Sequence, residues 1–194
     1  LTGNLDLDKI EPLITEKTKA IVAVHLYGQM CDMKKLKNLA DEFQLKIIED
    51  SAHCVEGSRD GIKPGNLSQA AAFSFYATKN ITCGEGGAVT TNDRELNEKI
   101  KVLRLHGLSR DAHNRYHSET FKQYDMEYPG YKYNMFDIQA ALLIHQMKRI
   151  DNALKRREEI WKIYDDAFLP YLQTPSICDN SRHARHLYTI WVDK

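Results

Sequence analysis

The sequence predicts an α/β fold built on a mostly parallel sheet. Two observations lead to this prediction. Apolar runs rich in β-branched residues at 19–27 and 46–50 indicate buried strands, and the amphipathic segment 32–44 between them indicates a helix. A strand, a helix and a strand in such a short span form a βαβ unit. The two strands of that unit run parallel, because the helix carries the chain back across the sheet.

The first elements follow in order. Residues 6–14 predict a short helix with an acidic start, and the strand at 19–27 ends at Gly28. The helix at 32–44 begins at Asp32, a residue type that caps helix N-termini well. One face of this helix is predicted to carry its apolar side chains, namely Met33, Leu36, Leu39, Ala40 and Phe43.

Two more strands, at 70–76 and 87–91, flank Lys79 and the glycine-rich turn "CGEGG". Residues 93–107 predict a helix with Gly107 as the C-cap. Residues 108–130 have no clear periodicity, and an irregular stretch of that length is more often functional or interfacial than idle.

The segment from about 135 to 169 is helical in pattern almost throughout. That is too long for one compact helix, so we expect a bend in it and a link between two domains. The chain starts without a methionine and stops at "LYTIWVDK", which has the pattern of an unfinished strand. We therefore expect a piece of a longer protein, truncated at both ends.

The composition excludes several classes of function. The 194 residues include 27 basic and 27 acidic side chains, so no excess charge points to nucleic acid or to an anionic membrane surface. No apolar run approaches the roughly 18 residues of a membrane span. The 4 cysteines form no CxxC pair and no signal peptide is visible, which indicates reduced thiols in a cytoplasmic protein.

Three polar residues lie where predicted strands end: Asp50, Ser74 and Lys79. Ligands of open parallel sheets bind beyond the carboxyl ends of the strands, so these side chains could share one crevice. Alone, Asp50 could cap a helix and Lys79 could be a surface lysine. Together they favour pyridoxal phosphate chemistry. That cofactor needs an amine to hold its aldehyde as a Schiff base and a carboxylate to keep its pyridine nitrogen protonated.

Each residue has a role in this hypothesis. Asp50 pairs with the pyridinium nitrogen. Lys79 forms the internal aldimine with pyridoxal 5'-phosphate and later moves the proton between the substrate and cofactor carbons. Ser74 donates its hydroxyl to the phosphate. The glycines of "CGEGG" let the backbone come close to the loop that carries the cofactor.

Four segments, "IIEDSAHCVEG", "FSFYATKNITCGEGGAVTTND", "LRLHG" and "GYKYNMFDIQAAL", resemble the DegT/StrS-type sugar-nucleotide aminotransferases. These enzymes belong to the fold-type-I (aspartate aminotransferase-like) superfamily. The resemblance runs across essentially the whole chain and implies a three-layer α/β/α large domain. It also implies transfer of an amino group, usually from L-glutamate, to a keto group on a nucleotide-linked sugar. "KNITCGEGG" with "GYKYN" is most similar to the UDP-4-amino-4-deoxy-L-arabinose–oxoglutarate aminotransferase branch.

The resemblance implies the same roles for Asp50, Ser74 and Lys79, and it adds His53. That residue matches a position that is Gln or His in the family and lies near the phenolic oxygen of the cofactor. The alternative is that His53 is an ordinary core histidine whose hydrogen bonds are made within the protein. By the same resemblance, residues 1–134 are part of the cofactor-binding large domain, 135–170 are an interdomain helical segment, and 171–194 begin a small C-terminal domain.

The resemblance also implies a homodimer with shared active sites. Many relatives read "GYNYRM" where this chain reads "GYKYNM", and their Asn reaches the phosphate bound by the neighbouring subunit. Lys132 and Asn134 are both candidates for that role here, and we assign it to Asn134.

Other residues carry weaker signals. The histidine pairs 113/117 and 183/186 lack a Cys or carboxylate at ligand spacing, so we expect no metal. His25, at a strand end, lines the crevice or packs in the core. A short-chain dehydrogenase is excluded, because no GxGxxG motif is present and Tyr76 is three residues from Lys79 rather than four. The remaining alternative is a non-catalytic regulator or partner subunit of the same fold.

Overall fold

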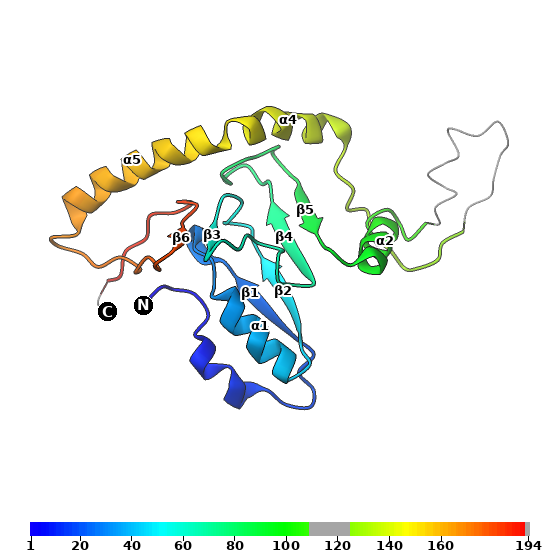
Figure 1. Ribbon diagram of the computed structural model, residues 1–194. Coiled ribbons are helices and arrows are strands. Elements are labelled where there is room, and N and C mark those ends of the chain that lie inside the picture. The colour runs from blue at the N-terminus through cyan, green and yellow to red at the C-terminus, as the bar shows by residue number, and fades with distance from the viewer. Residues whose placement is uncertain (109–124, 193–194) are drawn as a thin grey trace. The chain divides into compact units, whose positions relative to one another are not determined.

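The computed structural model describes residues 1–108 and 125–192. The chain divides into two compact units, one of Leu1–Thr90 with Asp137–Lys194 and one of Thr91–Phe136. The first unit contains the main sheet (Figure 1).

The sheet has four strands in the order β1 (Ala20–Val24), β2 (Lys46–Asp50), β4 (Ala70–Ser74) and β5 (Gly87–Thr90). β2 runs parallel to both β1 and β4, and β5 runs antiparallel to β4. The three parallel strands therefore end at one edge of the sheet, the edge along which α4 and α5 run in Figure 1. The predicted α/β class and the mostly parallel sheet are confirmed.

Helix α1 (Met33–Glu42) covers one face of this sheet. Asp32 caps it as predicted, because its Oδ1 accepts a hydrogen bond from the Lys35 N–H at 3.0 Å. The predicted apolar face is also confirmed: Met33, Leu36 and Ala40 are buried, and Leu39 and Phe43 pack against them. These side chains meet Ile21, Ala23 and Ile47 of the strands in one core.

The opposite face of the sheet is more exposed. Strand side chains alternate between the two faces, and Val24, Asp50 and Ala72 are aligned neighbours across three strands. Val22 and Val24 on this face are 58% and 39% exposed. The open face therefore ends, at the carboxyl edge, in Asp50 of β2 and in Ser74 of β4, two residues beyond Ala72.

The N-terminal segment differs from its prediction. In place of one helix over 6–14, the chain forms two short 3₁₀ helices, η1 (Leu7–Lys9) and η2 (Glu11–Leu13). Pro12 is the reason, because proline has no N–H to donate and its ring prevents a continuous helical ladder.

The long helical segment has the predicted bend. It consists of α4 (Asp137–Lys148) and α5 (Ile150–Phe168), with Arg149 between them at φ −111° and ψ 8°. After α5 the chain returns to pair β6 (Ser181–Arg182) antiparallel with β3 (Ser58–Arg59). The proposed domain limits at 134 and 170 stay a prediction. Within the described part of the chain, no helix has the length and apolarity needed to cross a membrane.

The second unit contains α2 (Arg94–Leu103). This helix ends at Leu103 and its C-cap is Arg104, three residues before Gly107, so the prediction that Gly107 is its C-cap was wrong. Gly107 instead has a left-handed φ of +69°, and a Cβ there would lie 1.8 Å from the Tyr128 carbonyl oxygen. A close approach of two backbone segments therefore requires this glycine.

Candidate active site

Asp50 and Ser74 both end parallel strands on the open face of the sheet, and both are half-buried. Asp50 Oδ1 accepts a hydrogen bond from the Ala52 N–H at 3.1 Å, and its other oxygen has no partner in residues 1–108 and 125–192. Ser74 Oγ accepts from the Tyr76 N–H at 3.3 Å, which leaves its own hydrogen free to donate. The edge of the sheet thus offers one carboxylate and one hydroxyl to a ligand.

Lys79 lies in the loop that joins β4 to β5. Backbone hydrogen bonds close the base of this loop: the Phe75 N–H donates to the Gly86 carbonyl at 2.8 Å, and the Cys83 N–H donates to the Phe75 carbonyl at 3.0 Å. The side chains of Phe75 and Cys83 are buried beneath it. The loop is therefore fixed at its base, and it carries Lys79 beyond the end of β4.

Gln146 of α4 holds the same loop from the other side. Its Oε1 accepts from the Thr82 N–H at 3.0 Å, and its Nε2 donates to the Thr82 carbonyl at 2.7 Å. One side-chain amide thus satisfies both backbone groups of a loop residue. No sequence pattern predicts this contact, since the two residues are 64 positions apart.

The Lys79 side chain is half-buried and, among the described residues, makes no hydrogen bond or ion pair. Buried lysines are rare unless paired, because burial removes water from the ammonium group. An unpaired amine in a fixed loop at the carboxyl edge of a sheet is available to react with or bind a ligand.

His53 lies close to both predicted charges. Its Nδ1 accepts from the Tyr27 N–H at 3.3 Å, so the neutral ring carries its hydrogen on Nε2 and offers a donor there. Burial lowers the pKa of His53, the positive charge of Lys79 lowers it further, and the negative charge of Asp50 opposes both effects. The structure therefore places Asp50 and Lys79 each within electrostatic reach of His53, while the roles of the three residues stay predictions.

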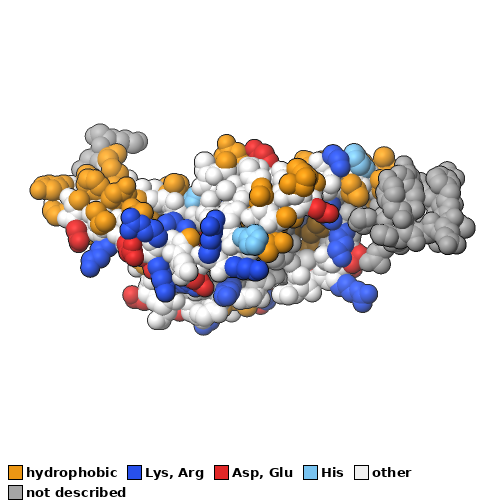
Figure 2. All heavy atoms as spheres, turned by 90° about the horizontal axis from the view of Figure 1, so that it is seen from above, with side chains coloured by type: hydrophobic (Ala, Val, Ile, Leu, Met, Phe, Trp, Pro, Cys, Tyr) orange, Lys and Arg blue, Asp and Glu red, His pale blue; other side chains and the backbone are white. Residues whose placement is uncertain are grey.

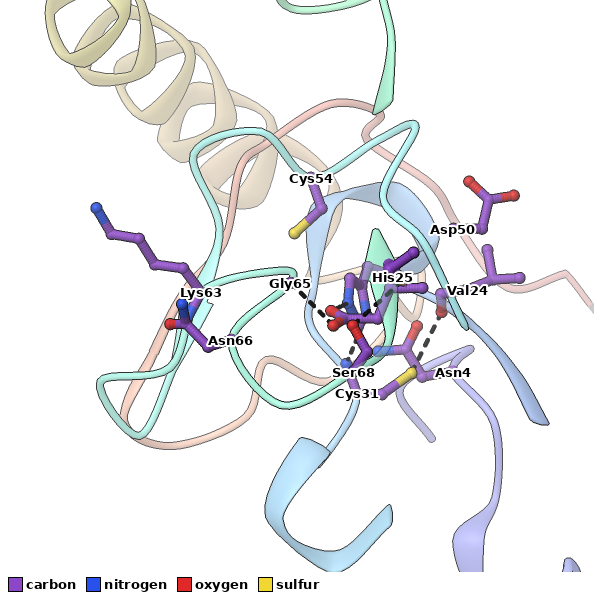
Figure 3. A network of polar contacts seen from close by, with 12 residues as sticks. Asn4, Val24, His25, Cys31, Asp50, Cys54, Lys63, Gly65, Asn66 and Ser68 are labelled. Carbon is purple, nitrogen blue, oxygen red and sulfur yellow. Dashed lines mark hydrogen bonds and ion pairs between the residues drawn. The ribbon is translucent and has the colours of Figure 1, made fainter. Parts of the chain in front are cut away.

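His25 does not line the crevice. It is fully buried, its Nε2 lies 2.6 Å from Glu49 Oε2, and its Nδ1 accepts from the Cys31 N–H at 3.2 Å. Glu49 Oε1 also accepts from the Gly65 N–H at 2.9 Å. Figure 3 shows this network from close by, with the carboxylate of Asp50 pointing away from it. Of the two readings of His25, core packing is the one the structure supports.

The remaining predicted residues belong to other parts of the chain. Asn134 and Lys132 belong to the second unit, where Lys132 Nζ donates to Asn134 Oδ1, and the phosphate role of Asn134 stays a prediction. His113 and His117 lie outside the described residues. Within residues 1–108 and 125–192, no three His, Cys, Asp or Glu side chains gather closely enough to hold a metal ion.

Comparison with known proteins gives a consistent result. The model of the DegT/DnrJ/EryC1/StrS aminotransferase family matches residues 1–194. The chain is 50% identical over 195 residues to the spore coat polysaccharide biosynthesis protein SpsC of Bacillus subtilis, covering 100% of this chain and 50% of that protein. It is 39% identical over 192 residues to the GDP-perosamine synthase of Caulobacter vibrioides, covering 97% and 49% respectively.

Among solved structures, the chain resembles a putative sugar aminotransferase from Streptococcus pneumoniae in its PMP-form. The TM-score is 0.88 at 31% identity, with coverage of 98% of this chain and 53% of that one. The chain thus spans about half the length of the proteins that it matches. The arabinose branch stays a prediction. The chain, with its α/β fold of the fold-type-I enzymes, belongs to the DegT/DnrJ/EryC1/StrS aminotransferase family.

Proposed function

We propose that the protein containing this chain is a pyridoxal phosphate-dependent aminotransferase. It moves an amino group from an amino acid, L-glutamate in our proposal, to the keto group of a nucleotide-linked sugar. The observation that carries the proposal is Lys79, half-buried and unpaired among the described residues, in a closed loop at the carboxyl edge of the sheet. Family membership and the similarity to a GDP-perosamine synthase support the sugar substrate.

The donor groups of the chain fit this cofactor. Asp50 offers a carboxylate oxygen without a partner among the described residues, which suits the ring nitrogen. Lys79 offers an amine for the aldehyde carbon, and Ser74 offers a hydroxyl hydrogen for the phosphate. His53 offers an Nε2–H donor, which suits the phenolic oxygen. When bound, the cofactor supplies an aldehyde and a ring that accepts electrons.

Each of these residues has a separate role in the proposed reaction. Asp50 holds a proton on the ring nitrogen, because a carboxylate beside a pyridine favours its charged form. Lys79 takes a proton at its Nζ atom and returns it, and the closed loop keeps the backbone that carries this side chain in place. Gln146 contributes indirectly by fixing the loop backbone at Thr82.

We also propose that the protein is a homodimer. Figure 2 views the molecule from the side of α4 and α5 and shows apolar side chains on that surface. The exposed apolar residues of α4 are Ile138, Leu142, Ile144 and Met147, each at least half exposed. Apolar side chains gathered in this way suit a protein partner. A second copy in which Asn134 reaches the neighbouring phosphate would complete the site.

The cysteines fit a reducing compartment. Cys31, Cys54, Cys83 and Cys178 form no disulfide in the part of the chain that the structure describes, and the first three are buried. Free thiols persist where glutathione and thioredoxin keep them reduced. We therefore propose the cytoplasm as the location.

The test is an amino-transfer assay on the complete protein with pyridoxal phosphate, L-glutamate and a panel of nucleotide-linked keto-sugars. We expect one member of the panel to yield an amino sugar together with an equal amount of 2-oxoglutarate. Lys79→Ala should abolish both products, while Lys34→Ala, which removes an exposed lysine of α1, should leave them unchanged. If no keto-sugar is converted, the protein is better explained as a non-catalytic regulator or partner subunit. If Lys79→Ala retains the activity, Lys79 does not have the role proposed here.

A further inference from the structure

Asn80, the residue after Lys79, has a side-chain amide whose orientation is fixed. Its Nδ2 donates to Glu56 Oε2 at 3.0 Å and to the Ala184 carbonyl at 2.9 Å, so both amide hydrogens are used. The Oδ1 atom then faces His186 Nδ1 at 3.0 Å. A flipped amide would set an acceptor against two acceptors, so this orientation is the stable one.

The two acceptors that fix Asn80 are themselves held. The Glu56 side chain is 1% exposed and pairs with the Arg157 guanidinium. Arg157 Nε also donates to the Ala184 carbonyl at 3.3 Å. A buried carboxylate in a charge-assisted pair is a firm support for the groups bonded to it.

The orientation of Asn80 determines the state of His186. Because Asn80 Oδ1 can only accept, His186 Nδ1 must carry a hydrogen. Burial lowers the pKa of His186 to about 4; a proton on His53, where present, and the positive charges of Lys79 and Arg157 add to this effect. The ring is therefore neutral near pH 7, with its only hydrogen on Nδ1. Its Nε2 is a lone-pair acceptor that has no hydrogen-bond partner in the part of the chain that the structure describes.

The position of His186 ties it to the candidate active site. Its ring packs on that of His53, with centroids 4.4 Å apart. Its backbone N–H donates to the Tyr27 carbonyl at 3.2 Å, in the same turn whose N–H bonds to His53. Gly28 permits this packing, since a Cβ there would lie 3.0 Å from the Ala184 Cβ. The two rings, tilted by 35° to each other, have opposite hydrogen positions: His53 offers a donor and His186 an acceptor.

We propose that His186 is a positioning residue of the active site, held as the Nδ1–H form by Asn80, whose Nε2 accepts a hydrogen bond from the Lys79 ammonium. This hydrogen bond forms after Lys79 has taken a proton at Nζ, and His186 neither gains nor loses a proton when it forms. It keeps the amine directed toward the reacting atoms between its two proton transfers. This inference rests on the proposed function, and it adds a residue that the family resemblance did not assign.

The hydrogen position on His186 is tested on the complete protein without cofactor, labelled with ¹⁵N at histidine. His186→Phe identifies the signal by its loss, and the phenyl ring keeps the packing on His53. We expect Nδ1 to carry the hydrogen and the ring to stay neutral down to about pH 5. A hydrogen on Nε2, or titration near the ordinary pKa of 6.5, overturns the proposal.

The functional part is tested on the protein loaded with pyridoxal phosphate. We expect His186→Phe to lower kcat about tenfold or more, with a smaller change in KM and a shifted pH profile. His183→Phe is the matched control: His183 is buried, its pKa is also lowered to about 4, and it bonds to the Arg185 N–H rather than to Asn80. It should change stability without moving the pH profile.

The two proposals fail separately. If borohydride attaches the cofactor to Lys79 in both histidine variants, but the two variants have the same kcat and the same pH profile, the role of His186 is refuted. The proposed aminotransferase function is then unaffected. If wild-type protein does not attach the cofactor at Lys79, the proposed function itself is refuted.

Discussion

The buried pair of His25 and Glu49 gives a sharp stability prediction for Glu49→Gln. Glu49 accepts two hydrogen bonds, one from His25 Nε2 at 2.6 Å and one from the Gly65 N–H at 2.9 Å. His25 Nδ1 accepts from the Cys31 N–H, so the hydrogen of the neutral ring is on Nε2. Glu49 therefore faces two donors, and a carboxylate is the side chain of this length that accepts both.

Glutamine has the same shape but one donor and one acceptor. In either orientation its NH₂ group faces an N–H group, of His25 or of Gly65, and one bond is lost. A hydrogen bond to a charged group contributes about 1.5–3 kcal/mol, and a buried donor left without a partner costs about 1–3 kcal/mol. These terms overlap, so we expect Glu49→Gln to lower the free energy of unfolding by about 2–4 kcal/mol.

The assay is urea unfolding of the complete protein, followed by fluorescence and circular dichroism. Glu42→Gln is the matched control, because Glu42 is exposed at the end of α1. It should change the free energy of unfolding by less than about 0.5 kcal/mol. The reasoning is refuted if Glu49→Gln is as stable as Glu42→Gln.

Three further predictions follow from the site. Gln146→Leu leaves both backbone groups of Thr82 without their partner, so we expect the free energy of unfolding to fall by about 1–3 kcal/mol. Hydrogen exchange at the Thr82 amide should become faster, and unchanged exchange would contradict the role of Gln146 in holding the loop. The pKa values of His183 and His186 are lowered to about 4, so between about pH 4 and 6.5 the unfolded chain binds protons at these residues that the folded chain does not bind. Stability should therefore fall as the pH drops from about 6.5 toward 4, by about 2 kcal/mol per histidine at pH 5, and unfolding curves at pH 8 and 5 that coincide would refute this. Asp50→Asn keeps the size of the side chain but loses its charge, so kcat should fall about 100-fold or more while the cofactor still attaches to Lys79. Full activity in this variant would show that Asp50 has no role in the mechanism.

The sequence predicted the sheet, α1 and the bend before α5, because local periodicity and capping determine each of these. It also placed Asp50 and Ser74 at the ends of strands and Lys79 beyond the end of one, since parallel strands end at one edge of a sheet; the roles of these residues stay predictions. The prediction of a single N-terminal helix was wrong because Pro12 interrupts the helical hydrogen bonds, a local effect that the sequence alone shows.

The supports of the site could not be predicted in this way. Gln146 reaches Thr82 across 64 residues, and Asn80 reaches Ala184 across 104. No short-range pattern encodes such contacts, which depend on how α4 and the segment after α5 return to the sheet. His25 left two readings open because its partner Glu49 lies 24 residues away on the neighbouring strand.

The most direct test of the account is to reduce the complete protein with borohydride in the presence of pyridoxal phosphate and to map the modified peptide. We predict a single modified residue, Lys79, with an absorption band in the roughly 410–430 nm range that is lost on reduction and absent from Lys79→Ala. Modification of another lysine, or equal labelling in Lys79→Ala, would contradict the assignment of Lys79 and the mechanism built on it.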